Sequence, residues 1–159
     1  MAVVNCWAPN RARIVFCCGS LGRQLTLTAA DLMVPVERLV PLQPATPLPE
    51  VIAHLTADGV GACWVARPEQ PARIHGLITD GDLRRALQSH GAEQWSRLTA
   101  ADLMTVDPIT VPGVTLAIEA IERMERNRRK AIGVLPVVDE EERMQGLLRL
   151  HDLVQAGLA

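Results

Sequence analysis

The spacing of apolar residues along the chain alternates between a helical and an extended pattern. Residues 48–57 place apolar side chains at i, i+3, i+4 and i+7, which predicts an amphipathic helix. These side chains are Leu48, Val51, Ile52 and Leu55. Gly59 follows where a glycine commonly ends a helix. Two short apolar runs, at 62–66 and 73–79, predict paired strands, and residues 80–90 predict a second helix directly after them.

The C-terminal part of the chain repeats this order of elements. The predicted elements are strands at 109–111, 132–138 and 144–150, and helices at 115–129 and 151–158. The residues expected on the buried face of the longer helix are Leu116, Ile118, Ile121 and Met124. With Leu39 and Val40 as a brief edge strand, each half becomes strand, helix, strand, strand, helix. The predicted fold class is therefore α/β (α+β), with two pseudo-symmetric repeats packed as one module.

An exact internal repeat supports this division. The residues Thr-Ala-Ala-Asp-Leu-Met occur at 28–33 and again at 99–104, so that Asp31 and Asp102 are 71 residues apart. Self-similarity at a fixed spacing indicates that one structural unit occurs twice. Each copy has a threonine followed three residues later by an acid, which predicts a capping box at the start of one short helical turn. We expect an N-terminal tail at 1–27, a first repeat at 28–98 and a second at 99–159.

Composition and charge narrow the classes of partner. The chain has 159 residues, 48% of them hydrophobic, and no apolar run approaches the roughly 18–20 residues that a membrane helix needs. The net charge is −2 and the only aromatic residues are three Trp and one Phe, so neither nucleic acid nor a membrane is an expected partner. The four cysteines form no C-x-x-C pair, and no secretory signal is evident. We expect reduced thiols and a cytoplasmic location. Residues 16–18 could form a short strand or belong to a disordered tail.

The candidate chemistry lies where a strand meets a helix in each half. Thr79 and Asp82 are three residues apart at the first junction, and either form another capping box or belong to a ligand site. Free amides at a helix N-terminus attract phosphate, and a carboxylate can accept two ribose hydroxyls. The second junction keeps the acid as Asp152 but has Arg149 in place of the threonine. A reciprocal box is impossible there, so Asp152 needs another role, which could be only to interact with the helix dipole.

These motifs resemble those of a known family. Two strand-helix-strand-strand-helix units, the first closing with Gly76-Leu77-Ile78-Thr79 and Asp82, resemble a pair of cystathionine-beta-synthase (CBS) domains, the Bateman module. More specifically, the runs from Thr79 to Arg85 and from His151 to Gly157 resemble the CBS pair at the C-terminus of bacterial arabinose-5-phosphate isomerases. The glycine-containing turn at 19–23 resembles the seam that joins such a pair to a sugar-isomerase (SIS) domain.

The resemblance implies a non-catalytic sensor that binds a nucleotide in the cleft between the repeats. The ligand would be AMP, ADP, ATP, a CMP-type nucleotide or a nucleotide-sugar, and no cofactor is required. By position, Thr79 and Asp82 belong to one site and Asp152 to the other, while backbone near Thr110 and Val111 would face the base. Arg149 departs from the family pattern and suggests that the second site is empty or prefers an anion. The implied partners are a second copy of the chain and an SIS-type isomerase domain.

Other readings of the sequence remain open. A structural dimerisation module without a ligand is the main alternative, and a fragment of a sugar-phosphate isomerase is another. Glu50 and Glu119 lie on predicted helices, with no histidine or second acid converging on them as acid/base chemistry requires. The basic run Arg126, Arg128, Arg129 and Lys130 is expected to be a solvated helix end, with phosphate contact as its alternative. The four histidines are too scattered to predict a metal site.

Overall fold

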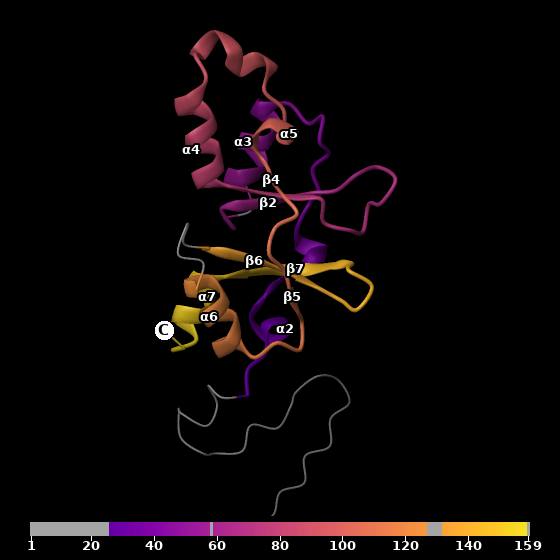
Figure 1. The fold of residues 1–159 in the computed structure, drawn as a ribbon, viewed down its shortest axis with the longest axis vertical. Coiled ribbons are helices and arrows are strands. Elements are labelled where there is room, and N and C mark those ends of the chain that lie inside the picture. The colour runs from indigo at the N-terminus through magenta and orange to yellow at the C-terminus, as the bar shows by residue number, and fades with distance from the viewer. Residues whose placement is uncertain (1–25, 58, 127–131, 159) are drawn as a thin grey trace, which may run out of the picture.

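The computed structural model describes residues 26–57, 59–126 and 132–158. The sequence predictions for residues 16–18 and 19–23, and for Arg128, Arg129 and Lys130, lie outside these ranges. The described chain forms two halves stacked on each other, each with its helices on the outside and its strands toward the other half (Figure 1). The predicted α+β architecture is confirmed by two separate sheets covered by helices.

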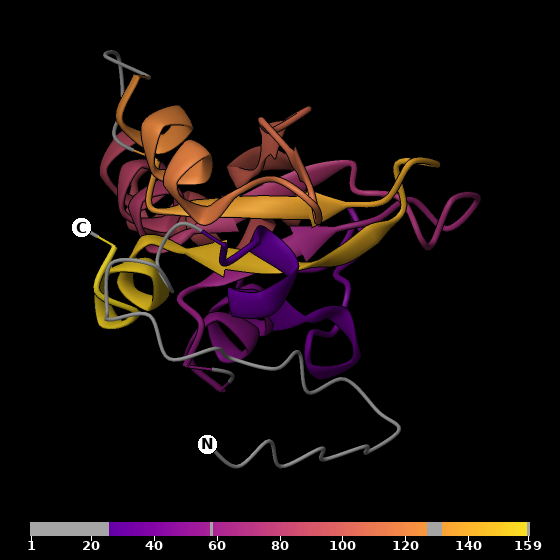
Figure 2. The ribbon, with the colours of Figure 1, turned by 90° about the horizontal axis from the view of Figure 1, so that it is seen from below.

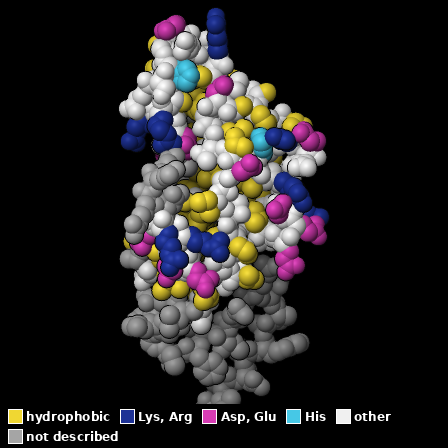
Figure 3. All heavy atoms as spheres, viewed as in Figure 1, with side chains coloured by type: hydrophobic (Ala, Val, Ile, Leu, Met, Phe, Trp, Pro, Cys, Tyr) yellow, Lys and Arg dark blue, Asp and Glu magenta, His cyan; other side chains and the backbone are white. Residues whose placement is uncertain are grey.

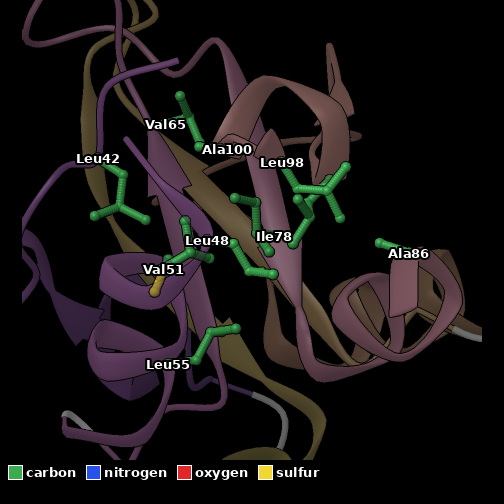
Figure 4. Packing of buried hydrophobic residues seen from close by; sticks show 11 residues of the cluster. Leu42, Leu48, Val51, Leu55, Val65, Ile78, Ala86, Leu98 and Ala100 are labelled. Atoms are coloured by element: carbon green, nitrogen blue, oxygen red, sulfur yellow. The ribbon is translucent and has the colours of Figure 1, made fainter. Parts of the chain in front are cut away.

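The first half follows the predicted order closely. Its elements are α3 (Leu48–Ala57), β2 (Ala62–Val65), β3 (Gly76–Thr79) and α4 (Asp80–Ser89), followed by the short η2 (Ala92–Arg97). Strands β2 and β3 pair antiparallel, with Trp64 opposite Leu77. Alternate residues of a strand point to opposite faces, so Cys63 and Val65 turn toward the helices. There they pack with Val51, Leu55 and Ile78 in the first-half core (Figure 4).

The second half contains β5 (Val111–Pro112), α6 (Ala117–Arg126), β6 (Val134–Val138), β7 (Met144–Arg149) and α7 (Leu150–Gln155). Strand β6 pairs parallel with β5 and antiparallel with β7. The core of the second half contains fully buried side chains from β6, β7, α6 and α7, among them Met124, Leu135, Leu148 and Leu153.

The two repeated hexapeptides exchange places between the halves. The first copy forms α2 (Ala29–Leu32), followed by β1 (Val34–Pro35) and η1 (Val36–Arg38), and the second forms α5 (Ala100–Leu103), followed by β4 (Thr105–Val106). Strand β1 pairs with β7, and β4 pairs with β3, so each of these lead-in segments joins the sheet of the other half. Figure 1 shows α5 among the first-half helices and α2 below with the second half, and Figure 2 shows α2 lying across the sheet of the second half.

Two glycines explain how the exchanged segments come so close. A Cβ added to Gly146 would lie 2.4 Å from the carbonyl oxygen of Val34, and one added to Gly76 would lie 2.5 Å from the Met104 sulfur. Gly76 and Gly146 are the first residues of the two strand-to-helix motifs, and each faces the lead-in of the other repeat. At Gly146 only a residue without a side chain permits this approach of backbone to backbone, whereas at Gly76 a side chain would require the Met104 side chain to move.

A third cluster of buried side chains joins the two halves. Trp64 and Leu77 from the first half pack with Met144 and Leu147 from the second. The indole nitrogen of Trp64 is buried there and, among the described residues, has no hydrogen-bond partner. The halves therefore share a continuous apolar contact between their sheets.

Several local predictions were wrong. Leu39 and Val40 form no strand; instead Leu42, four residues after the end of η1, makes an isolated parallel bridge with Val65. Ile118 was placed on the buried face of α6, but it is 42% exposed, because the small Ala117 and Ala120 take the positions against the sheet. Ile52 on α3 is also partly exposed, at 37%. No helix in the described part of the chain has the length and apolar character needed to cross a bilayer.

Candidate functional site

The first strand-to-helix junction holds a buried carboxylate. Thr79 has an extended backbone and is the N-cap of α4, and it forms the predicted capping box with Asp82. The Thr79 amide donates to Asp82 Oδ2 at 2.9 Å, and its hydroxyl donates to the same oxygen at 2.5 Å. Asp82 is only 6% exposed. The turn that starts the helix therefore also fixes the orientation of this acid.

The other carboxylate oxygen faces groups that the sequence analysis did not identify. Arg85, one turn further along α4, forms an ion pair with Asp82 Oδ1, and its own side chain is half exposed. Thr105 from β4 places its hydroxyl 3.5 Å from the same oxygen. Thr105 belongs to the second repeat, so both repeats contribute to this site. Its only sequence signal is its position directly after the repeated hexapeptide.

The second junction is arranged differently because Arg149 engages its acid. Arg149 Nε donates to Asp152 Oδ2 at 2.7 Å, and Nη2 donates to Oδ1 at 2.6 Å, a bidentate ion pair. The hydrogen bonds to Asp152 raise the pKa of Arg149 above its ordinary value. The suggestion that Asp152 serves only the helix dipole was wrong, because its carboxylate is held by Arg149.

Arg149 also connects the two halves. Its Nη1 donates to the carbonyl oxygen of Gly59 at 2.9 Å. Gly59 lies after α3 in the first half and has a φ of +60°, a conformation that favours glycine. The Arg149 guanidinium thus binds both the acid of its own junction and the backbone of the other repeat. In the first junction the corresponding residue is Thr79, which has a hydroxyl instead.

The remaining predicted residues lie elsewhere. Val111 is fully buried in β5, where it pairs with Val137 in the second-half sheet. Thr110 is half-buried and lines a pocket with residues of the β2–β3 connection, such as Arg67 and His75. The structure thus brings Thr79 together with Asp82, and Arg149 together with Asp152. Contact of a base with Thr110 and Val111 stays a prediction.

The two junctions lie at the same end of the module. Strand β3 ends at Thr79 and β7 ends at Arg149, and each is followed at once by a helix. The hairpin connections between β2 and β3 and between β6 and β7 extend together at the opposite end (Figure 1). Both acids therefore lie near the helices, away from the hairpins.

Comparisons with known proteins agree with this architecture. The family model for the CBS domain matches residues 29–89 and 100–159. Arabinose 5-phosphate isomerase KdsD from Pseudomonas aeruginosa is 39% identical over 140 residues, which are 88% of this chain and 41% of that enzyme. The chain therefore spans less than half the length of this relative.

Solved structures show the same fold. CBSX2 in complex with AMP has a TM-score of 0.66 at 25% identity, covering 82% of this chain and 96% of that one. The CBS domain of a bacterial CNNM/CorC family Mg²⁺ transporter in complex with ATP has a TM-score of 0.71 at 22% identity, covering 86% and 91%. With both repeats matched by the family model and the paired fold matched by these structures, the chain belongs to the CBS-domain family as a tandem pair.

Proposed function

We propose that this CBS pair senses a nucleotide, which binds in the first half at Thr79 and Asp82. The observation that carries the proposal is the buried Asp82 carboxylate at the N-terminus of α4, with Thr105 of the second repeat beside it. A carboxylate in this position can accept ribose hydroxyls, while helix N-terminal amides favour a phosphate. Arg85 is exposed enough to move from Asp82 to a phosphate.

A relative of known structure supports a nucleotide as the ligand class. CBSX2, which shares the fold at 25% identity, was crystallised with AMP. Cytidine nucleotides and nucleotide-sugars are further candidates in this proposal. In this proposal Thr110 and Val111 contribute backbone near the base.

The second junction does not bind a nucleotide in this proposal. A ribose would have to displace both hydrogen bonds from Arg149 to Asp152, as well as the bond from Arg149 to Gly59. Hydrogen bonds to charged groups contribute about 1.5–3 kcal/mol each, so this competition is costly. We therefore expect one nucleotide per chain.

The module would act on a sugar-isomerase domain and assemble as a homodimer. Exposed large apolar side chains lie on helices of both halves, including Ile52 on α3, Ile118 on α6 and Val154 on α7. Covering such residues is the usual driving force for association of helices. Sedimentation equilibrium tests this part, and a monomer at high concentration would contradict it.

The nucleotide proposal is tested by thermal shift and calorimetry with AMP, ADP, ATP and CMP. A ligand at one hundred times its dissociation constant adds about 2.7 kcal/mol to the stability of the folded state. The Asp82→Asn variant should lose this gain. Asp102→Asn, which changes the equivalent acid of an exposed capping box, should keep it. If no nucleotide stabilises the parent chain, the structural dimerisation module becomes the better description.

A further inference from the structure

The hairpin end of the module contains a cavity of about 500 Å³ that lies apart from Thr79 and Asp82, and Thr110 is the one lining residue that the nucleotide proposal also uses. It lies between the β2–β3 connection of the first repeat and the segment after β4, together with the β6–β7 hairpin, of the second. Its volume is in the range of small-molecule binding pockets. His75 at the pocket and Thr79 at the nucleotide site are separated by the length of β3, about 13 Å at the usual strand rise.

The two walls of this pocket differ in chemistry. The first repeat supplies hydrogen-bond donors, which are Arg67, Gln70 and Arg73, together with His75. The second repeat supplies mainly acceptors, which are Asp107, Thr110 and Glu142. Figure 3 shows basic, acidic and histidine side chains gathered at this edge of the molecule. No Phe, Tyr or Trp is among the described residues that line the pocket.

On the donor wall from the first repeat, Arg67 is the arginine whose charge is not balanced by a carboxylate among the described residues. Arg73 is already paired with Glu142 across the halves, at 3.4 Å. Within the described residues, Arg67 has no carboxylate at salt-bridge distance, and its polar contact is to His75, at 3.3 Å between Nη2 and Nε2. A guanidinium can only donate, so Nε2 of His75 is the acceptor in this contact. Arg67 therefore keeps its charge and most of its donors for a ligand.

The opposite wall is held in place by backbone contacts. Asp107 has a φ of 46°, and its amide donates to the carbonyl oxygen of His75 at 3.3 Å. The amide of Met144 donates to the carbonyl oxygen of Ala72 at 2.8 Å, which ties the hairpin of the second repeat to the connection in the first. These backbone hydrogen bonds therefore fix the donor wall of the first repeat and the acceptor wall of the second repeat relative to each other.

We propose that this pocket binds a small phosphorylated or carboxylated polyol, with Arg67 on the anionic group and Asp107 on the hydroxyls. Guanidinium groups bind phosphate and carboxylate through two parallel hydrogen bonds, and carboxylates accept from hydroxyl groups. An inorganic anion satisfies only the donor wall, and a neutral sugar satisfies only the acceptor wall. A ligand with both features bridges the repeats.

Calorimetry with ribose 5-phosphate, inorganic phosphate and ribose tests this proposal. Ribose 5-phosphate should bind more tightly than either of the others, and Arg67→Gln should weaken its binding by at least about tenfold. Arg97→Gln, which removes the same charge from an exposed residue outside the pocket, is the matched control and should have no effect. Asp107→Asn should reduce the preference for ribose 5-phosphate over inorganic phosphate.

Trp64 offers a second readout, because Ile74 lines the pocket and also packs against the cluster that contains Trp64. Its fluorescence should change on binding in a variant that lacks the other two tryptophans. Equal affinity for inorganic phosphate and ribose 5-phosphate, or equal effects of Arg67→Gln and Arg97→Gln, would overturn the proposal. So would the absence of binding at millimolar ligand. Asp82→Asn should leave this binding unchanged, which separates it from the nucleotide site.

Discussion

The ion pair between Arg149 and Asp152 can be tested by a double-mutant cycle with Arg149→Gln, Asp152→Asn and the double variant. The pair is bidentate, and the two side chains are 24% and 17% exposed. Exposed pairs contribute about 0.2–1 kcal/mol, and well-shielded hydrogen bonds to charged groups contribute about 1.5–3 kcal/mol. For a pair that is mostly shielded, we expect a coupling energy of about 1–2 kcal/mol.

Arg149→Gln should cost more than the coupling energy, because it also removes the hydrogen bond to Gly59 in the other half. We expect about 2–3 kcal/mol in total, and a decrease of about 4–12 °C in melting temperature for a chain of this size. Asp152→Asn should cost less, because the bond to Gly59 remains. Urea denaturation followed by two probes gives the free energies of unfolding and checks that the transition is two-state.

A matched pair on the same protein provides the control. Arg73 and Glu142 also connect the halves, but at 3.4 Å and with side chains 47% and 78% exposed. Their cycle should give a coupling energy below about 0.5 kcal/mol. If the cycle of Arg149 and Asp152 gives a value as small as this, the role assigned to Arg149 in holding the second junction is refuted.

Three further predictions concern other parts of the module. Gly146→Ala should destabilise the protein by more than Gly76→Ala, because its new methyl group meets a backbone oxygen rather than a methionine side chain. Overpacking of this kind costs about 1–3 kcal/mol. Equal decreases in the free energy of unfolding, measured by denaturant titration, would contradict the exchanged packing. Donation from the Thr99 amide and hydroxyl lowers the pKa of Asp102, so the stability from this box is complete above the unfolded value of about 3.9 and is lost as the pH falls through the folded value. In an NMR titration Thr99→Ala should raise the pKa of Asp102, and an unchanged pKa would refute the assigned cause. Finally, Arg149→Thr restores a hydroxyl at the second junction and should raise the nucleotide stoichiometry in calorimetry from one to two; a ratio that stays at one would show that Arg149 does not block the site.

Local patterns in the sequence predicted the elements that depend on local interactions. The helix at 48–57 has the predicted bounds, because apolar spacing and the following glycine both mark it. The capping boxes at Thr28, Thr79 and Thr99 are confirmed, because each depends only on residues three apart. The family resemblance is confirmed by the match to the CBS-domain model in both repeats.

The features that the sequence did not predict depend on contacts between distant segments. The exchange of α2 and α5 leaves no trace in apolar spacing, because the two copies are identical and either could serve either half. The bond from Arg149 to Gly59 joins residues 90 positions apart. The donor and acceptor walls of the hairpin pocket come from opposite repeats, so neither repeat predicts the pocket alone.

The exchanged lead-in segments also limit how the module can move. Ala29 is fully buried in the second-half core, and Ala100 is fully buried in the first-half core. A hinge motion that opened the two halves like a book would have to pull both residues, and the strand pairs beside them, out of these cores. If one sheet slides or rotates slightly over the other, both lead-in segments stay buried in these cores. If the two proposed sites bind ligands, a conformational change at either of them should therefore pass to the other half as a sliding of one sheet over the other.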